Sequence, residues 1–172
     1  PKGRKLVVPC VNFDLDLLYL RSEDIPEYVS RGTADFGIVG ENLLYEKKPK
    51  VKKLRKLGFG ECKLIIAVPA DSDIKTLKDL EGERIATSYP ETLKTFLEEK
   101  SISASIIFIK GSCEIAPTLN LADAICDITQ TGETLHENDL RILTQVLESE
   151  ACLIESPIVN PQKDNFLQLC KL

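Results

Sequence analysis

The sequence predicts an α/β fold, and three observations lead to that prediction. Short apolar segments rich in β-branched residues alternate along the 172 residues with segments of helical periodicity. Glycine-bearing turns follow several of the expected strands, as at Gly40 and Gly132. Hydrophobic residues make up 43% of the chain, which is enough for a sizeable core in one large domain or two small lobes. Alternating strands and helices favour parallel sheets, in which ligands bind at the carboxyl ends of the strands.

In the first half of the chain, apolar runs alternate with segments that begin like helices. Residues 22–26 place hydroxyl and acidic side chains before Pro26, which favours a helix that ends at Gly32. The basic run at residues 47–56 is interpreted as a solvated connection. The strands expected in this half are residues 5–10, 15–20, 34–39 and 64–68, and a second helix starts within residues 41–46.

The second half of the chain repeats this alternation. Pro90 fits the first position of a helix whose inward face carries Leu93, Phe96 and Leu97. Residues 160–172 are expected to form a closing helix. Further strands are expected at residues 84–87, 105–109, 124–129 and 151–155, with short helices at residues 74–80 and 111–117 and one unassigned segment at residues 141–146.

Charge and composition exclude several classes of protein. A formal net charge of −5 argues against nonspecific nucleic-acid binding, which needs a basic face. The longest apolar stretches are too short to span a bilayer, and no signal peptide is visible. The six cysteines are scattered without a CxxC pair, which is poor spacing for zinc and unlike a disulfide framework. We therefore expect a cytoplasmic protein whose cysteines are mostly small buried hydrophobes.

The stretch at residues 123–135 carries the strongest functional signal. An expected strand with carboxylates at Asp123 and Asp127 leads into a threonine-rich turn around Gly132. Backbone N–H groups and hydroxyls that converge in such a turn can bind a phosphate. Asp127 could accept hydrogen bonds from sugar hydroxyls or face a phosphate-bound metal ion. The same pattern also fits an ordinary turn in which Gly132 supplies a positive φ.

A longer signature runs from Glu114 through Asp127 to the turn at residues 131–135. Supporting segments are residues 24–26, 34–42, 59–64 and 84–90. With these segments in this order, nearly the whole chain resembles one family, the ATP phosphoribosyltransferases that open histidine biosynthesis. So many ordered matches are more specific than a single turn, and the resemblance favours phosphate binding by residues 131–135.

The sequence departs from the family pattern at two places. Asn120 stands where the family usually has glycine, a position that asparagine can fill because it tolerates left-handed backbone. In the family, Lys-Gly-Arg begins a leucine-containing helix, whereas here Arg4 runs directly into Lys5. A segment is therefore expected to be missing after Arg4.

The resemblance implies two α/β lobes like those of type II periplasmic binding proteins, with the chain crossing twice between them. Lobe I would comprise residues 1–62 plus 152–172, and lobe II would comprise residues 63–151 with the phosphate-binding turn. The crossings are expected near residues 62–64 and 149–152. The cleft between the lobes is the implied active site.

The resemblance also implies the reaction. Phosphoribosyl would be transferred from phosphoribosyl pyrophosphate to N1 of ATP with release of pyrophosphate, and Mg²⁺ would neutralise the leaving group. Asp127 is the implied catalytic residue, which would meet the ribose hydroxyls or stabilise developing positive charge. No residue stands out as a general base, and no protein-built metal site is expected.

The implied binding residues form two groups. Phosphoribosyl pyrophosphate would be bound by Asp123, Asp127, Thr131, Gly132, Glu133, Thr134 and Leu135. ATP or pyrophosphate would contact Lys2, Arg4, Arg21, Lys63 and Glu114. Because the turn would act through backbone N–H groups, Glu133 should point its side chain away. Glu114 either binds the nucleotide or caps its helix.

Partners and alternatives complete the expectations. The family has a long form with a carboxyl-terminal histidine-binding domain and a short form with a separate regulatory subunit related to a tRNA synthetase. Both forms are oligomeric, so a homo-oligomer is expected, with a regulatory subunit if this is a short form. The alternatives are a noncatalytic two-lobed small-molecule-binding protein and a phosphoribosyltransferase that uses another base.

Overall fold

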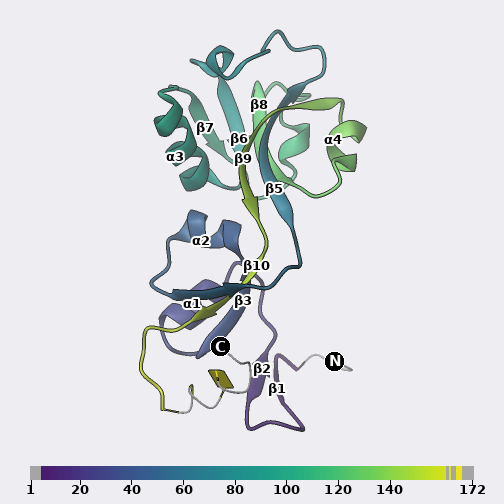
Figure 1. The fold of residues 1–172 in the computed structure, drawn as a ribbon. Helices are drawn as coiled ribbons and strands as arrows, with labels where there is room; N and C mark the ends of the chain where they lie inside the picture. Colours follow the sequence, from purple (N-terminus) through teal and green to yellow (C-terminus); the bar gives the residue numbers. More distant parts are fainter. Residues whose placement is uncertain (1–4, 162, 164–165, 168–172) are drawn as a thin grey trace. The chain divides into compact units, whose positions relative to one another are not determined.

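The computed structural model describes residues 5–161, 163 and 166–167, and its ribbon is drawn in Figure 1. The chain divides into two compact units. The first unit comprises Pro1–Val39, Pro49–Arg55 and Cys152–Leu172, and the second comprises Gly40–Lys48 and Lys56–Ala151. The lobe boundaries expected from the sequence stay a prediction, and the compact units differ from them because residues 40–48 and 56–62 group with the second unit.

The first unit contains, within the described residues, a two-stranded ribbon and a three-stranded sheet. Strands β1 (Val7–Pro9) and β2 (Asp16–Leu18) pair antiparallel in the ribbon. The sheet has the order β3-β10-β4, with β3 at Phe36–Gly40, β10 at Ala151–Glu155 and β4 at Lys52–Lys56. The basic connection predicted at residues 47–56 is therefore wrong in its second half. Strand β4 lies at the edge of its sheet and has one apolar residue, Leu54, among lysines and arginine, so no apolar pattern marks it; such charges are common on sheet edges.

Helix α1 (Ile25–Ser30) begins where the sequence predicted, with proline in its first turn. It packs closely on β3 at Gly37. A Cβ atom on Gly37 would lie 2.7 Å from Cγ2 of Ile25 and 2.8 Å from Cγ2 of Val29. Close helix packing therefore explains this glycine, and no ligand is needed to account for it.

The second unit contains, in the part of the chain that is described, a five-stranded sheet of order β7-β6-β8-β5-β9. Its strands are β5 (Cys62–Pro69), β6 (Arg84–Thr87), β7 (Ser105–Phe108), β8 (Ala124–Thr129) and β9 (Leu140–Ser149). Strand β6 runs parallel to β7 and β8, but β5 runs antiparallel to β8 and β9. The predicted parallel sheet is thus wrong for β5, and the segment left unassigned at residues 141–146 forms the antiparallel strand β9. The chain enters the unit along β5 and leaves along β9, with Cys62 opposite Ser149, so these strands must run in opposite directions.

Apolar side chains cover both faces of this sheet, as expected for strands buried on both sides. Leu64 and Ile66 pack with Leu93 and Phe96 of helix α3 (Pro90–Lys100). The other face of β5 packs with the 3₁₀ turn η2 (Cys113–Ile115) and helix α4 (Glu133–Glu137). Figure 1 shows α3 and α4 on opposite sides of the sheet.

The shorter helices differ most from the predictions. The helix expected at residues 74–80 is a single 3₁₀ turn, η1 (Leu77–Leu80). A capping box between Thr76 and Asp79 stabilises its amino-terminal end. Helix α4 was not predicted, since its residues were assigned to the turn. In the expected closing helix at residues 160–172, residues 162, 164–165 and 168–172 lie outside the described residues.

Helix α2 (Glu41–Lys47) lies between β3 and β4 in sequence but is bonded to the second unit. The N–H of Asn42 donates to Oγ of Ser149 at 2.9 Å, and that hydroxyl donates to Oδ1 of Asn42 at 3.0 Å. The Glu46 carboxylate accepts from the N–H groups of Glu91 (3.1 Å) and Thr92 (2.9 Å) at the start of α3. These bonds explain why α2 belongs with the residues that follow β4.

The cysteines follow the expectation from composition. Cys113, Cys126 and Cys152 are buried, Cys10 and Cys62 are half-buried, and these five described residues are free thiols. Burial raises the pKa of the Cys113 thiol to about 12, which keeps it protonated. Of the helices that the structure describes, none has the length and apolar character needed to cross a bilayer.

Candidate functional site

The carboxyl ends of β6, β7 and β8 lie at one edge of the second unit's sheet because these strands are parallel. The loops that leave this edge contain Tyr89, Glu114 and the turn at residues 131–135. Open α/β sheets bind ligands at such edges. The structure therefore brings Glu114 and the predicted phosphate-binding turn to the same end of the sheet.

Asp127 lies in β8 near this edge, paired across the sheet with Ile65. Its Oδ1 accepts the N–H of Ile128 at 2.7 Å. Burial raises the pKa of the Asp127 carboxyl above its usual value, and the nearby charge of Glu114 adds to the rise, while the hydrogen bond from Ile128 opposes it. A carboxylate held in such a poorly hydrated place is suited to meet positive charge or hydroxyl groups of a ligand.

The turn after β8 leads directly into α4. Gly132 has a φ of 83°, which favours glycine, and Oγ1 of Thr131 accepts the N–H of Glu133 at 3.4 Å. Leu135 is buried in the core below, so only its main chain is available to a ligand. A Cβ atom on Gly132 would meet nothing within 4 Å, so the main chain here is open to an approaching group. The first N–H groups of a helix lack intrahelical partners and can bind an anion.

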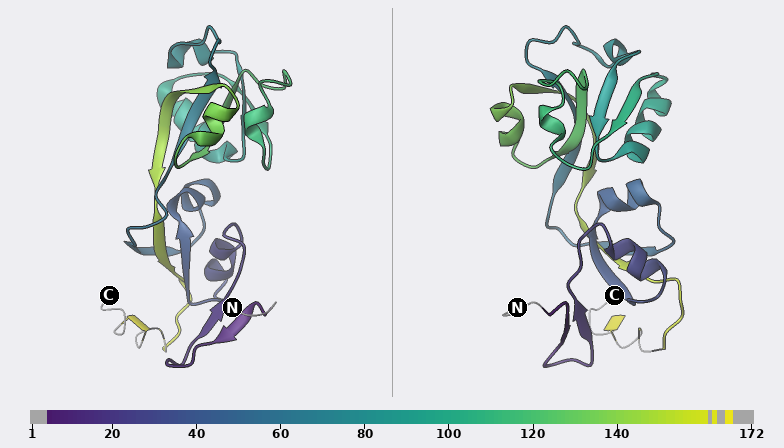
Figure 2. Two further views of the ribbon diagram at one scale, coloured as in Figure 1. Left: turned by 90° about the vertical axis from the view of Figure 1, so that its right-hand side faces the viewer. Right: turned by 180° about the vertical axis from the view of Figure 1, so that it is seen from behind.

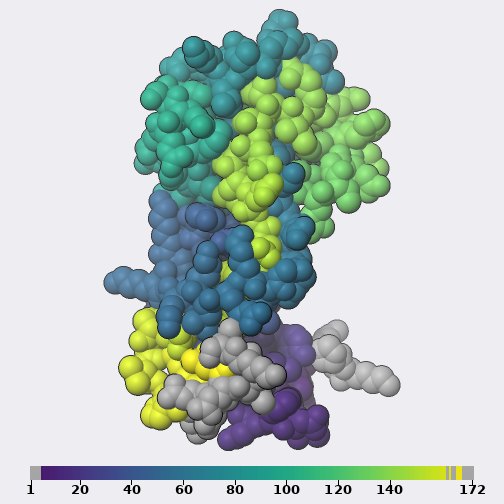
Figure 3. Space-filling view, viewed as in Figure 1, coloured from purple at the N-terminus to yellow at the C-terminus, as the bar shows by residue number. Residues whose placement is uncertain are grey.

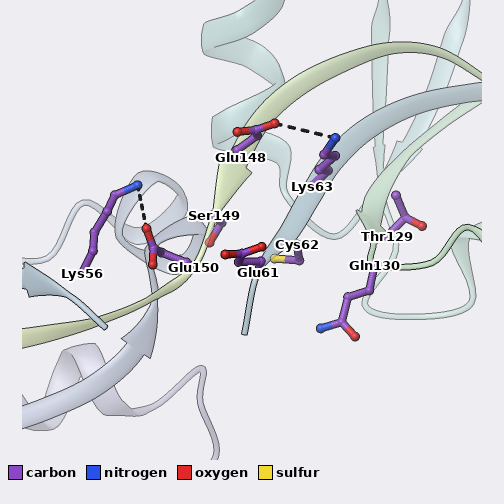
Figure 4. A pocket seen from close by; sticks show the side chains of 9 residues that line it. All are labelled: Lys56, Glu61, Cys62, Lys63, Thr129, Gln130, Glu148, Ser149 and Glu150. Carbon is purple, nitrogen blue, oxygen red and sulfur yellow. Dashed lines mark ion pairs between the residues drawn. The ribbon is translucent and has the colours of Figure 1, made fainter. Parts of the chain in front are cut away.

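A polar cavity of about 480 Å³ reaches Thr129 and Gln130, the two residues that directly precede the turn. Its lining side chains come from β5, the end of β8, the end of β9 and the segments beside them: Lys56, Glu61, Cys62, Lys63, Thr129, Gln130, Glu148, Ser149 and Glu150. Figure 4 shows two ion pairs in this cavity, which join Lys63 Nζ to Glu148 at 3.7 Å and Lys56 Nζ to Glu150 at 3.1 Å. A ligand anion that binds these lysines must replace or share their carboxylate partners.

Asp123, which the sequence grouped with the turn, lies at the other end of β8. An extended strand rises about 3.3 Å per residue, so Asp123 and Thr129 are separated by roughly 20 Å. Arg84 holds the Asp123 carboxylate: its Nε donates to Oδ2 at 2.9 Å and its Nη2 to Oδ1 at 2.7 Å. The structure does not bring Asp123 to the turn, because strand β8 separates them.

The ion pair between Arg84 and Asp123 leads to a prediction about the pH dependence of stability. Hydrogen bonds from Arg84 lower the pKa of Asp123 to about 2. A carboxyl with a lowered folded-state pKa contributes stability above its usual 3.8 that is lost as the pH falls toward 2. Asp123→Asn is therefore expected to lower the stability of the protein by about 1–2 kcal/mol at pH 7, and by almost nothing near pH 2.

Thermal unfolding of both proteins across this pH range measures the difference. Glu99→Gln, at an exposed position of α3, is the control and should change little at any pH. A difference between Asp123→Asn and the unchanged protein that persists at pH 2 would contradict the role given to the carboxylate.

The remaining predicted residues do not form one group in the described part of the structure. Lys2 and Arg4 lie outside the described residues. Arg21 is exposed in the first unit, just before α1, where its carbonyl accepts the N–H of Asp24 at 2.9 Å. Lys63 lies opposite Thr129 in the pairing of β5 with β8 and lines the cavity.

Several cavity residues were missed by sequence reasoning. Lys56 was hidden in the basic run, and Glu61, Gln130 and the segment 148–150 were assigned no role. Residues 148–150 end a strand whose partner, β5, is distant in sequence, so no local pattern marks them. The one signal was that Glu61 lies within the matched segment 59–64.

Comparison with known proteins gives consistent results. A family model described as ATP phosphoribosyltransferase matches residues 21–171. The ATP phosphoribosyltransferase of Cytophaga hutchinsonii is 48% identical over 165 residues, which are 96% of this chain and 58% of that protein. The ATP phosphoribosyl transferase (HisG:HisZ) complex from Thermotoga maritima is 30% identical with a TM-score of 0.79, covering 91% of this chain and 75% of that one.

A more distant likeness concerns the fold alone. The periplasmic aliphatic sulphonate binding protein SsuA from Escherichia coli is 16% identical, with a TM-score of 0.61 over 87% of this chain and 56% of that one. The predicted likeness to two-lobed periplasmic binding proteins is confirmed. The chain spans 58% of the length of the first curated relatives that it matches.

Proposed function

Because the chain belongs to the ATP phosphoribosyltransferase family, we propose that it carries the transfer of phosphoribosyl from phosphoribosyl pyrophosphate to N1 of ATP. The observation that supports this most directly is the set of groups at the carboxyl ends of β6, β7 and β8. The open main chain at Gly132 and the half-buried carboxyl of Asp127 lie at that edge of the sheet, beside a cavity that contains two lysines. A phosphate, a ribose and a pyrophosphate each need one of these features.

The turn at residues 131–135 would hold the 5′-phosphate. Its contribution comes from main-chain N–H groups, since Gly132 has no side chain and Leu135 buries its own. Thr131 and Thr134 are exposed and offer hydroxyls, and Glu133 is also exposed, so its carboxylate can lie in solvent away from the phosphate. Holding the phosphate fixes the anomeric carbon for attack.

Asp127 would lie against the ribose. As pyrophosphate departs, positive charge develops on the sugar ring, and a poorly hydrated carboxylate stabilises that charge more strongly than one in water. N1 of neutral adenine carries a free lone pair, so the attack needs no general base. This agrees with the absence of a base among the residues that the sequence singled out.

The leaving pyrophosphate would be met by cations and by Mg²⁺. Among the residues described by the structure, no three His, Cys, Asp or Glu side chains form a cluster that could hold a metal ion. Mg²⁺ is commonly held by substrate phosphates together with one or two carboxylates, and Asp127 with Glu114 fits that donor set. Bound in this way, Mg²⁺ would neutralise charge on the pyrophosphate.

Lys63 and Lys56 are the described lysines placed to contact the pyrophosphate or the triphosphate of ATP. Lys2, Arg4 and Arg21 remain proposed contacts that follow from the resemblance. Each described lysine would exchange a carboxylate partner for a phosphate, so binding is expected to weaken as ionic strength rises.

Partners are proposed on the same basis. The Thermotoga maritima relative was solved as a HisG:HisZ complex, which supports a separate regulatory subunit for this chain. A homo-oligomer and a cytoplasmic location stay predictions. The free thiols of the five described cysteines suit a reducing compartment.

The test is release of pyrophosphate from ATP and phosphoribosyl pyrophosphate with Mg²⁺ present. Release that requires both substrates supports the proposal, and replacing ATP by other purine nucleotides tests for a different base. Calorimetry with each substrate covers the other candidate: binding of either ligand without turnover, also after addition of a relative's regulatory subunit, would favour a noncatalytic binding protein.

A further inference from the structure

Helix α3 follows β6 after a short loop, and its first turn already binds a carboxylate. The N–H of Glu91 donates to Oε1 of Glu46 at 3.1 Å, and the N–H of Thr92 donates to Oε2 at 2.9 Å. The hydroxyl of Thr92 donates to the same Oε2 at 2.8 Å. Pro90 has no N–H, and the N–H of Leu93 donates to the N-cap carbonyl at 3.0 Å. The first-turn donors of this fully described helix are therefore all used.

The carboxylate comes from a segment distant in sequence, helix α2. Glu46 lies one turn after Asn42 on α2, and side chains four residues apart share a helix face. On that face Nδ2 of Asn42 donates to the hydroxyl of Tyr89 at 3.3 Å, in the loop between β6 and α3. Both views in Figure 2 keep the blue α2 beside the teal α3, and blue and teal atoms adjoin in Figure 3. Helix α2 therefore holds both this loop and the start of α3.

The arrangement around Glu46 is the one by which helices bind phosphate. Two neighbouring N–H groups and a hydroxyl converge on the two oxygens of one anion, at the positive end of a helix of 11 residues. Strands β6 and β8 are parallel neighbours, so the start of α3 and the turn at residues 131–135 lie at the same edge of the sheet. This edge thus has two places suited to an anion, and the chain fills one of them with its own carboxylate.

We propose that Glu46 is a positioning residue that keeps substrate phosphates away from α3 and so leaves the turn at residues 131–135 as the place for the 5′-phosphate. This inference rests on the proposed function. Phosphoribosyl pyrophosphate carries phosphate at both ends, so an edge with two open anion places would bind it in more than one orientation. Only one orientation puts the anomeric carbon beside Asp127. Glu46 acts through the helix start that it occupies and does not touch the substrate.

The first test uses inorganic phosphate as the probe. Glu46→Ala vacates the N–H groups of Glu91 and Thr92. Phosphate is added to the isotope-labelled full chain at constant ionic strength, and the amide signals are followed by nuclear magnetic resonance. The amides of Glu91 and Thr92 should shift with phosphate in Glu46→Ala, with an affinity about fivefold or more above that in the unchanged protein.

Two further variants separate the occupied helix start from effects of charge and folding. Glu91→Ala removes an exposed carboxylate from the same turn but leaves Glu46 bound, so its amides at residues 91 and 92 should ignore phosphate. Glu46→Gln keeps the size of the side chain with one acceptor oxygen in place of two, and it should bind phosphate at α3 more weakly than Glu46→Ala. Circular dichroism shows which variants are folded, and Glu46→Gln carries the test if Glu46→Ala is not.

Kinetics distinguishes positioning of the substrate from simple support of α3. Misoriented binding occupies the enzyme without changing the productive reaction of free enzyme with free substrate. In Glu46→Ala, kcat and the KM for phosphoribosyl pyrophosphate should therefore fall by the same factor, about fivefold, while kcat/KM stays unchanged. A residue that only stabilised α3 would lower kcat/KM or leave both constants as they are.

The proposal is overturned if neither Glu46 variant binds phosphate at residues 91 and 92, or if the unchanged protein or Glu91→Ala binds it there equally well. It is also overturned if kcat and KM do not fall together. Failure of the proposed function gives a different result: the unchanged protein would release no pyrophosphate and residues 131–135 would not respond to phosphate. The response of α3 in the Glu46 variants would still be measured in that case.

Discussion

Gly132→Val is expected to abolish turnover while the second unit stays folded. The added side chain would project from the open main chain at which the 5′-phosphate is proposed to bind, since a Cβ there meets no protein atom within 4 Å. The phosphate would then lose backbone donors, and loss of donors to a reacting anion costs about 100-fold to 1,000-fold in rate. Steady-state kinetics with varied phosphoribosyl pyrophosphate measures the loss.

The difficulty with such a variant is backbone strain, and the chain offers a matched control. Gly82 has a φ of 81° against 83° for Gly132, and a Cβ on it also meets nothing within 4 Å. Gly82 precedes β6 and lies away from the turn. Gly82→Val should therefore cost the same strain, about 1–2 kcal/mol, without affecting turnover. Equal loss of activity in both variants, or normal kinetics in Gly132→Val, would remove the phosphate site from residues 131–135.

Asp127→Asn is expected to lower turnover by about 100-fold or more without lowering stability at neutral pH. The charge proposed to stabilise the ribose would be lost. Folding should not suffer, because burial raises the pKa of Asp127 above its usual 3.8 and the native state therefore disfavours the charge. A carboxyl with a raised folded-state pKa destabilises the fold as the pH rises above 3.8, so the variant should gain stability relative to the unchanged protein from pH 4 toward neutrality.

Asp123→Asn, directly before the same strand, is expected to have the opposite effects on stability and turnover. It should lose stability at pH 7 and keep turnover, because its carboxylate is held by Arg84 at the far end of β8. Thermal unfolding and kinetics on the two variants therefore form a crossed comparison. If Asp123→Asn also lost turnover, the ion pair would have to act on the site through β8, and the assignment of the reacting edge would fail.

Most of the strands and helix α3 were predictable because local patterns determine them. The apolar runs of β5 and β8 and the proline at the start of α3 each occur in consecutive residues. Strand β4 was missed because its stability comes from pairing with β10, about a hundred residues away, while its own residues are mostly charged. The direction of β5 was missed and β9 was left unassigned for a similar reason, since no local pattern records where a chain enters and leaves a sheet.

The candidate site also has parts that local sequence predicts and parts that depend on the pairing of distant segments. The turn at Gly132 and the carboxylate of Asp127 follow one another in sequence, so their joint role could be inferred from the chain. Asp123 was grouped with them on proximity in sequence, although a strand places its two ends far apart. The cavity walls at Lys56 and at residues 148–150 depend on the pairing of distant segments and left no local pattern.

The attachment of α2 has a practical consequence for recombining relatives. Helix α2 is encoded between two strands of the first unit, yet Asn42 is bonded to Ser149 and Glu46 to the start of α3. A chimera that transplants only residues 56–151 from a homologue would take the donor and the acceptor of each bond from two different parent chains. Exchanging residues 40–48 along with that block keeps both partners of each bond in one parent, so the smallest interchangeable module of this chain is discontinuous in its sequence.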